Sequence, residues 1–237
     1  MIIHVHAPMG NEADRLPWFL DHYQFATQIF LYANHCTDNS RKIAAQVPCV
    51  EVKEWQTPAY DDECLLQLKN NCWKDQQADW VIVCDIDEHL HAKDLNAMLR
   101  LFSGDSSFAI LRPFEAWEMV TQEDISWYKE ATHGFRSPGH KKPCLFQPAY
   151  VADINYLPGC HHCNAVAKNG GRLEPVMLRN LTMRHYQCVG VNRVLKRYRE
   201  RAAIMSERNK EQGWGRQYLW SEAEARAYFN RPTELVL

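Results

Sequence analysis

Three carboxylates within four positions, Asp85, Asp87 and Glu88, have the clearest capacity for chemistry in this chain. They follow the apolar run Trp80–Cys84, whose length and composition predict a strand buried on both faces, as in a parallel sheet covered by helices. In an extended chain Asp85 and Asp87 share one face, and ligands of open α/β sheets collect at the carboxyl ends of strands. Their like charges repel unless a cation neutralises them, and carboxylate oxygens favour Mg²⁺ or Mn²⁺. The alternative is an acidic turn that caps a helix beginning near Lys93.

Length and composition indicate an ordinary globular protein. The chain has 237 residues, enough for one sizeable α/β domain, with 46% hydrophobic and 24% charged residues. Its formal net charge of −2 argues against a nucleic-acid partner, because such proteins carry a strong basic excess. No apolar stretch approaches the roughly 18 residues that span a bilayer, and the first residues resemble a strand more than a signal peptide. We therefore expect a soluble, cytoplasmic protein.

Nine cysteines, an odd number spread over predicted strands and helices, favour free thiols in a reducing compartment over a disulfide framework. One cluster, the Cys-His-His-Cys run over residues 160–163, has metal-like spacing. A structural zinc site usually needs a second pair of ligands, and Cys188 alone does not supply it. We prefer two local thiols beside a histidine pair, with zinc as the alternative.

The first hundred residues alternate predicted strands and helices, which implies right-handed crossovers and a mostly parallel central sheet. We expect strands at 2–6, 28–32, 49–55 and 80–84, and helices at 16–25, 38–46, 61–77 and 93–102. The second half is more irregular. It has predicted strands at 108–113, 143–146 and 176–185, a Gly/Pro-rich loop at 132–142, and a helix with one apolar stripe at 191–209.

Three stretches follow or form predicted strands in a fixed order. Asn11 and Glu12 follow the first strand, residues 32–40 (YANHCTDNS) follow the second, and residues 80–88 (WVIVCDIDE) form the fourth. They are similar to the N-E, Y-D-N-x-S-T-D-x-S and W-V-hydrophobic-D-x-D-E motifs of the family 2-like nucleotide-sugar glycosyltransferases of the A-type fold, a group with small bacterial and viral members. Ala33 departs from this pattern, because the family usually has an aspartate there that reaches the nucleotide.

The resemblance continues to the C-terminal part of the chain, where His185 and Tyr186, the helix behind them and the Gly-Trp-Gly at 213–215 fit the same group. Two further departures are Cys36, in place of a small hydroxyl residue, and His89, in place of a phenylalanine. The resemblance implies an α/β protein of the A-type fold, with a Rossmann-like sheet and helices on both faces. We expect one domain over residues 1–237, with a nucleotide-sugar-binding half at 1–102 and an acceptor-side half at 103–237.

The activity that the resemblance implies is the transfer of a sugar from a nucleotide-sugar donor to a glycan or lipid-linked acceptor, with inversion, in polysaccharide synthesis. We predict Asp87 as a direct ligand of Mn²⁺ or Mg²⁺, which as a Lewis acid neutralises the diphosphate leaving group. Asp85 is expected to reach the metal through water or to contact the donor ribose. The resemblance implies a C-terminal histidine as a further ligand. His185, at the end of a predicted strand, is the candidate, against a histidine satisfied by backbone groups.

Further donor contacts are expected from two places. The residues after the first and second strands either contact the donor or cap the helices that follow, and both roles can hold at once. The helix behind the metal strand carries a donor contact by resemblance, although its lysine also fits an ordinary solvated position. The expected donor-contacting residues are Asn11, Glu12, Thr37, Asp38, Lys69 and Asn71.

The catalytic base must lie on the acceptor side, within hydrogen-bond reach of the incoming hydroxyl. We predict Glu115, just past the strand at 108–113, with His161 as the second candidate. His140, Lys141 and Lys142 lie in the Gly/Pro-rich loop and could approach the diphosphate when that loop closes.

The helix at 191–209 carries a basic face. Its residues are Arg193, Lys196, Arg197, Arg199 and Arg201. Such a face either contacts an anionic membrane that bears a lipid-linked acceptor or is the solvated side of an amphipathic helix, and we prefer the second interpretation.

Two other functions remain open from the sequence. A phosphohydrolase can also place a D-x-D motif after a buried strand, but families of that kind usually carry it on the first strand, whereas here it ends the fourth. A domain of the glycosyltransferase fold that binds nucleotide sugar or carbohydrate without turnover is the other alternative.

Overall fold

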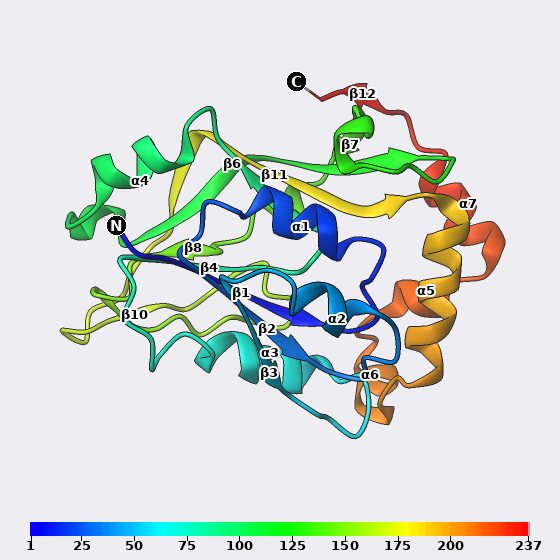
Figure 1. The fold of residues 1–237 in the computed structure, drawn as a ribbon, viewed down its shortest axis with the longest axis horizontal. Helices are drawn as coiled ribbons and strands as arrows, with labels where there is room; N and C mark the ends of the chain where they lie inside the picture. The colour runs from blue at the N-terminus through cyan, green and yellow to red at the C-terminus, as the bar shows by residue number, and fades with distance from the viewer. Residues whose placement is uncertain (237) are drawn as a thin grey trace.

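A ten-stranded sheet forms the centre of the protein. The structure is a computed structural model and describes residues 1–236 (Figure 1). Its strand order is β12-β7-β6-β8-β4-β1-β2-β3, with β11 beside β6 and β5 beside β11. The first four strands are parallel and lie side by side in the order β4-β1-β2-β3. Their bounds are β1 Ile3–Met9, β2 Gln28–Ala33, β3 Val50–Glu54 and β4 Trp80–Val83. The predicted α/β class, with a Rossmann-like parallel sheet in the first half, is confirmed.

Helices cover both faces of this sheet. In β4, Trp80 and Ile82 pack into the cluster that includes the residues of α1, α2 and α4, whereas Val81 and Val83 pack on the opposite side with Leu66 of α3. The strand before the acids is therefore buried on both faces, as its composition predicts. The helices are α1 Leu16–His22, α2 Ser40–Ala44, α3 Asp62–Asn71 and α4 Leu95–Phe102. Side-chain oxygens of Asp61 and Asp94 cap the last two.

Two long strands dominate the second half, and both run past their predicted ends. β6 spans Ile110–Thr121 and pairs in parallel with β11, which spans Val176–Val189. Shorter strands complete the sheet: β5 Glu88–His91, β7 His133–Arg136, β8 Leu145–Phe146 and β12 Glu234–Leu235. A separate pair is β9 Val151–Asp153 with β10 Val166–Ala167. Four 3₁₀ turns lie at Ser106–Phe108, Tyr128–Glu130, Pro138–His140 and Arg216–Leu219.

The predicted loop at 132–142 is wrong in its first part, because it contains β7. Gly134 lies there opposite β6, where an added Cβ would come within 2.5 Å of the Glu118 carbonyl oxygen. This glycine therefore permits the close approach of two strands and does not mark a turn.

The predicted helix at 191–209 is two helices, α5 Val191–Ala203 and α6 Glu207–Gln212. The chain between them bonds to Tyr60, whose N–H donates to the Ile204 carbonyl and whose carbonyl accepts from Ser206 N–H. Ser206 then caps α6 by accepting from Asn209 N–H. A last helix, α7, spans Glu222–Phe229. Tertiary contacts therefore end a helical pattern that the sequence continues.

Within residues 1–236, every helix is too short or too polar to cross a bilayer.

Candidate functional site

The acidic motif lies on a turn at the carboxyl end of β4. The strand ends at Val83, and a turn over residues 86–87 leads directly into β5. Asp85 and Glu88 close this turn, since Glu88 N–H donates to the Asp85 carbonyl and Asp85 N–H donates to Glu88 Oε2, each at 3.0 Å. The expected extended-chain alternation therefore does not apply to Asp85 and Asp87. The tight turn brings the acids together instead.

Two cavities meet at these acids. The first has a volume of about 450 Å³ and the second about 240 Å³. Tyr60, Leu65, Asp85 and Asp87 line both of them. A group bound between the cavities would therefore contact both carboxylates.

The first cavity is built from the loops that follow β1 and β2, together with the inner face of α5. Pro8 and Met9 end β1, Gly10 to Glu12 come from the first loop, and Asn34, His35 and Thr37 come from the second. Arg197 and Arg201 project from α5, which adds positive charge to the wall. Trp55 and Tyr60 supply aromatic surface. The cavity thus combines ring-stacking surface with guanidinium groups.

The second cavity is lined mainly by ionisable side chains. Lys69 comes from α3, Lys142 and His140 follow β7, His161 comes from the loop after β9, and His185 comes from β11. His140 and His185 stack with ring centroids 4.0 Å apart.

Asp85 is held by two buried lysines. Lys69 Nζ lies 2.7 Å from Asp85 Oδ1, and Lys142 Nζ lies 3.4 Å from Oδ2. Lys142 also forms an ion pair with the fully buried Glu88. Burial alone would raise the pKa of Asp85, but the two lysines hold that pKa below its usual range. Asp85 is therefore ionised at neutral pH and already partnered.

Asp87 has a different set of partners. Its Oδ2 accepts a hydrogen bond from the buried Arg15 at 3.1 Å, and Arg197 Nη1 lies 3.8 Å away. Its Oδ1 faces His185 Nε2 at 3.6 Å. Burial would raise the pKa of Asp87, but His185 and the arginines hold that pKa well below its usual range.

The groups around His185 fit a metal site. Its Nδ1 lies 2.8 Å from the buried Glu118, so that carboxylate fixes the ring with Nε2 facing Asp87. A carboxylate on the far nitrogen is the usual support of a metal-binding histidine. The 3.6 Å separation of the two donor atoms is short enough for both to reach one ion at about 2.0–2.2 Å. Asp87 and His185 therefore form a compatible donor pair.

His185 differs from its prediction in one respect. β11 continues to Val189, so His185 lies inside the strand and not at its end. Register places it between Glu88 on β5 and Glu118 on β6. Its ring is held by carboxylates and not by backbone groups.

The predicted donor-contacting residues divide into two groups. Asn11, Glu12 and Thr37 line the first cavity, and Lys69 lines the second. The Asn11 amide also organises the loop, because its Oδ1 accepts from Thr37 N–H at 2.7 Å. Asn11 therefore lines the cavity and holds the loop after β2, but it caps neither α1 nor α2.

Asp38 and Asn71 lie outside both cavities. Asp38 accepts hydrogen bonds from Ala13 N–H and from the backbone and hydroxyl of Ser40, so it ties the loop after β1 to the start of α2. Asn71 is exposed on α3 and donates to the Gln67 carbonyl. Neither position supports a donor contact, since neither side chain lines a cavity and both are bonded within the protein.

Of the two predicted bases, only His161 lines a cavity. Glu115 accepts from Arg136 at 2.9 Å on β6 and lies outside both cavities, so its position does not support a role as base. His161 lines the second cavity, where its Nδ1 bonds to the Gly139 carbonyl. Because a carbonyl only accepts, Nδ1 carries the proton and Nε2 is left as an acceptor. Burial lowers the pKa of His161, which keeps its ring neutral.

The inner residues of α5 are the part of the site that sequence reasoning missed. The sequence favours a solvated face for the basic run, and Lys196 and Arg199 are indeed exposed. Arg197 is buried against Glu12, and Arg201 packs over the rings of Tyr60 and Tyr218 at 5.0 and 5.2 Å. Their four-residue spacing places both on one face of the helix, which was a usable signal.

The two cysteines of the run at 160–163 lie in different places, one at the second cavity and one against the apolar core. Cys160 lines the second cavity beside His161, and Cys163 packs against the apolar cluster around Tyr156.

Comparisons with known proteins give matches among solved structures. No family model and no curated protein matches the chain. The chain is similar to glucosyl-3-phosphoglycerate synthase from Mycobacterium tuberculosis, crystallised with Mn²⁺, UDP and phosphoglyceric acid, at 15% identity and a TM-score of 0.34. That match covers 48% of this chain and 43% of the synthase, so the chain spans less than half of the synthase's length.

A second similar structure is S. aureus TarS. Its 1-349 form in complex with UDP is 12% identical with a TM-score of 0.46, over 96% of this chain and 75% of that one. The match to the longer TarS structure has 12% identity and a TM-score of 0.44, over 98% of this chain and 44% of TarS.

Proposed function

We propose that this protein is a metal-dependent glycosyltransferase of the A-type fold, which moves a sugar from a nucleotide-sugar donor to a glycan or lipid-linked acceptor. The observation that carries the proposal is the meeting of the two cavities at Asp85 and Asp87. Sugar transfer needs a donor and an acceptor on either side of one reacting carbon, and the arrangement supplies two such spaces.

The first cavity fits the donor nucleotide. Trp55 and Tyr60 offer aromatic surface to a base, and the guanidinium groups of Arg197 and Arg201 can form paired hydrogen bonds to phosphate oxygens. Asp87 and His185 would hold Mn²⁺ or Mg²⁺, which supplies Lewis-acid neutralisation of a diphosphate leaving group. At the junction of the cavities, Asp85 contributes negative charge, and Lys69 and Lys142 beside it contribute positive charge. The diphosphate of the donor would thus lie between the two cavities.

The second cavity fits the acceptor. We propose His161 as the base, because its neutral Nε2 can accept the proton of an incoming hydroxyl while Gly139 fixes the ring. A base on the opposite side of the acids from the nucleotide supports a single displacement with inversion. Nine free thiols support a reducing, cytoplasmic setting, and the proposed role is polysaccharide synthesis.

The test is the release of nucleoside diphosphate from a panel of nucleotide sugars, measured with Mn²⁺ and with a chelator. The wild type should release it only with metal. Asp87→Asn should lose about 100-fold or more in rate, because several kcal/mol of charge stabilisation are removed. Asp79→Asn is the matched control, since Asp79 is an exposed carboxylate just before the other end of β4.

Other outcomes point to the alternatives. Release of inorganic phosphate from sugar phosphates would favour a phosphohydrolase. Binding of nucleotide sugar without turnover, equal in the wild type and Asp87→Asn, would favour a non-catalytic binding domain.

A further inference from the structure

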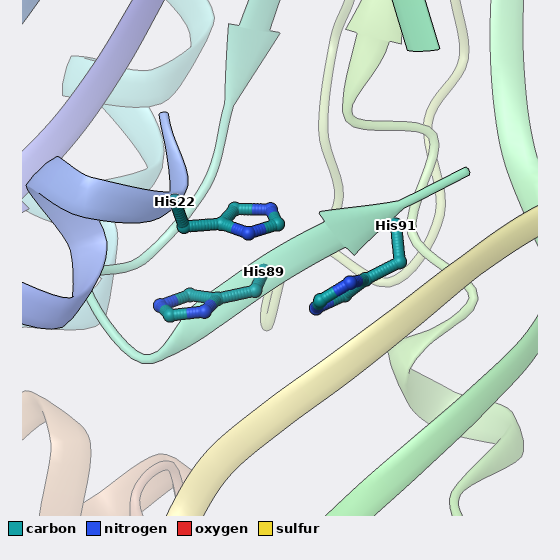
Figure 2. A group of neighbouring side chains, drawn as sticks. All are labelled: His22, His89 and His91. Atoms are coloured by element: carbon teal, nitrogen blue, oxygen red, sulfur yellow. The ribbon is translucent and has the colours of Figure 1, made fainter. Parts of the chain in front are cut away.

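Three histidines form a cluster that the proposed sugar transfer does not use. His22 is the last residue of α1, and His89 and His91 share one face of β5 because they are two residues apart. Figure 2 shows the three rings around a common space, with the His22 ring over that of His89. One nitrogen from each ring lies within 4.8 Å of the other two.

The hydrogen bonds of the cluster leave ring nitrogens available. His22 Nε2 lies 3.0 Å from the Leu90 carbonyl, which can only accept, so Nε2 carries the proton and Nδ1 has a free lone pair. His89 Nδ1 and His91 Nε2 are buried, and neither has a hydrogen-bond partner among residues 1–236. Leaving a buried polar atom unpaired is unfavourable. A ligand that accepts lone pairs would satisfy all three rings.

We propose that His22, His89 and His91 bind a divalent transition-metal ion of the zinc type. Imidazole nitrogens without carboxylates favour zinc, copper or nickel over magnesium or manganese. The bond from His22 to a backbone carbonyl is the support that a metal-binding histidine usually has. In tetrahedral coordination two nitrogens at 2.0–2.1 Å from a zinc ion lie about 3.4 Å apart. Nitrogens that are up to 4.8 Å apart must therefore approach each other by up to about 1.4 Å, which rotation about the side-chain torsions can supply.

Charge in the surroundings acts in both directions. Burial lowers the pKa of His22 to about 4, and burial likewise holds the pKa of His89 and His91 well below the ordinary value. The positive charges of Arg184 and Lys129 disfavour a bound cation, whereas the negative charge of Asp21 favours it. Because these charges partly cancel, the site favours an ion that forms strong bonds to nitrogen over an ion attracted by charge alone.

The site would join two elements next to the acidic turn. β5 begins at Glu88, immediately after the turn that carries Asp85 and Asp87, and α1 lies against it. An ion shared by α1 and β5 would therefore stiffen the strand that positions those acids. Solvent can complete the coordination, because His22 and His91 are partly exposed.

The test is Zn²⁺ binding to the full chain with reduced thiols, by equilibrium dialysis and by competition with a chromogenic chelator. We expect the wild type to bind one equivalent at this cluster, separate from any ion held by Asp87 and His185. His89→Phe and His91→Phe should each weaken this site by at least about 100-fold, since loss of supporting contacts alone weakens such sites roughly 10–100-fold. Phenylalanine keeps the aromatic packing. His4→Phe is the matched control, because His4 is a buried histidine with an unpaired Nδ1 outside the cluster.

Two further measurements separate this site from the cysteines and from the Glu88, His140 and His185 group. The Co²⁺-loaded protein should show d–d bands without a sulfur-to-metal charge-transfer band, and His140→Phe should leave binding intact.

Circular dichroism and unfolding midpoints without metal check the fold, and His91→Gln, at a partly exposed position, provides a second variant. The proposal is wrong if the wild type binds no Zn²⁺, if the cluster variants bind it as tightly as the wild type, or if Co²⁺ reports thiolate ligands.

Discussion

At the scale of single residues, the site neutralises its carboxylates before any ligand arrives. Asp85 lies against Lys69 and Lys142, and Asp87 against Arg15. The sequence predicted the cluster of acids and the need for a cation, because both follow from local spacing. It could not predict these internal cations, since they come from other segments that only the fold brings together.

Lys142 gives a direct test of this buried charge. Lys142→Met should destabilise the fold by about 3–5 kcal/mol, because it leaves the fully buried Glu88 without its cation. Lys210→Met is the control, since Lys210 pairs with Glu207 on an exposed helix surface, where such pairs contribute little. Denaturant unfolding measures both. Equal effects of the two substitutions would contradict the buried ion pair.

His6 makes stability depend on pH. Burial lowers its pKa to about 3 from an unfolded value of about 6.5. The neutral ring therefore contributes stability that is present above pH 6.5 and is lost as pH falls toward 3, by up to about 1.4 kcal/mol per pH unit. His6→Phe, which preserves the stack on Phe30, should make the loss between pH 6 and pH 4 shallower. Urea unfolding across pH measures this slope.

The exposed His133 provides the comparison for that slope. His133→Phe should leave the pH dependence unchanged. A His6→Phe profile that coincides with the wild type would show that the ring titrates normally in the fold.

At the scale of elements, the most accurate predictions concern the parallel half. β1, β2 and β4 are where the apolar runs predict them, because both faces of each strand are buried and composition alone is informative. β5 was missed, since Glu88–His91 reads as a polar segment until β11 pairs with it. The end of α5 was also missed, because its cause is a backbone contact with Tyr60. Long-range pairing decides elements whose local pattern is ambiguous.

α5 divides its basic residues between solvent and site, and a pair of substitutions tests that division. Arg201→Met should weaken binding of nucleoside diphosphate by about 10- to 100-fold, because it removes a charged donor from the first cavity. Arg199→Met, two residues away on the exposed side, should not change binding. Isothermal titration with UDP and other nucleoside diphosphates measures both. If both variants bind like the wild type, α5 does not contact the diphosphate.

At the scale of the whole molecule, neither cavity belongs to one half of the chain. The first cavity takes Arg197 and Arg201 from the second half, and the second takes Lys69 from the first half. The division at residue 102 into a donor half and an acceptor half stays a prediction, and both cavities take residues from each side of it. Sequence patterns identified the loops after β1 and β2, but not the segment of α5 that closes over them.

Because the first cavity joins both halves, its ligand should stabilise the whole fold. A nucleoside diphosphate with Mn²⁺ at ~100 times its dissociation constant adds about 2.7 kcal/mol to the free energy of unfolding. For a chain of this size, that corresponds to a rise in the unfolding midpoint of about 5–10 °C. Chelation should remove most of the rise if Asp87 and His185 hold the metal that bridges protein and diphosphate. A rise that is the same with chelator would place the nucleotide in the cavity without a metal, and would leave the arginines of α5 as the groups that bind its phosphates.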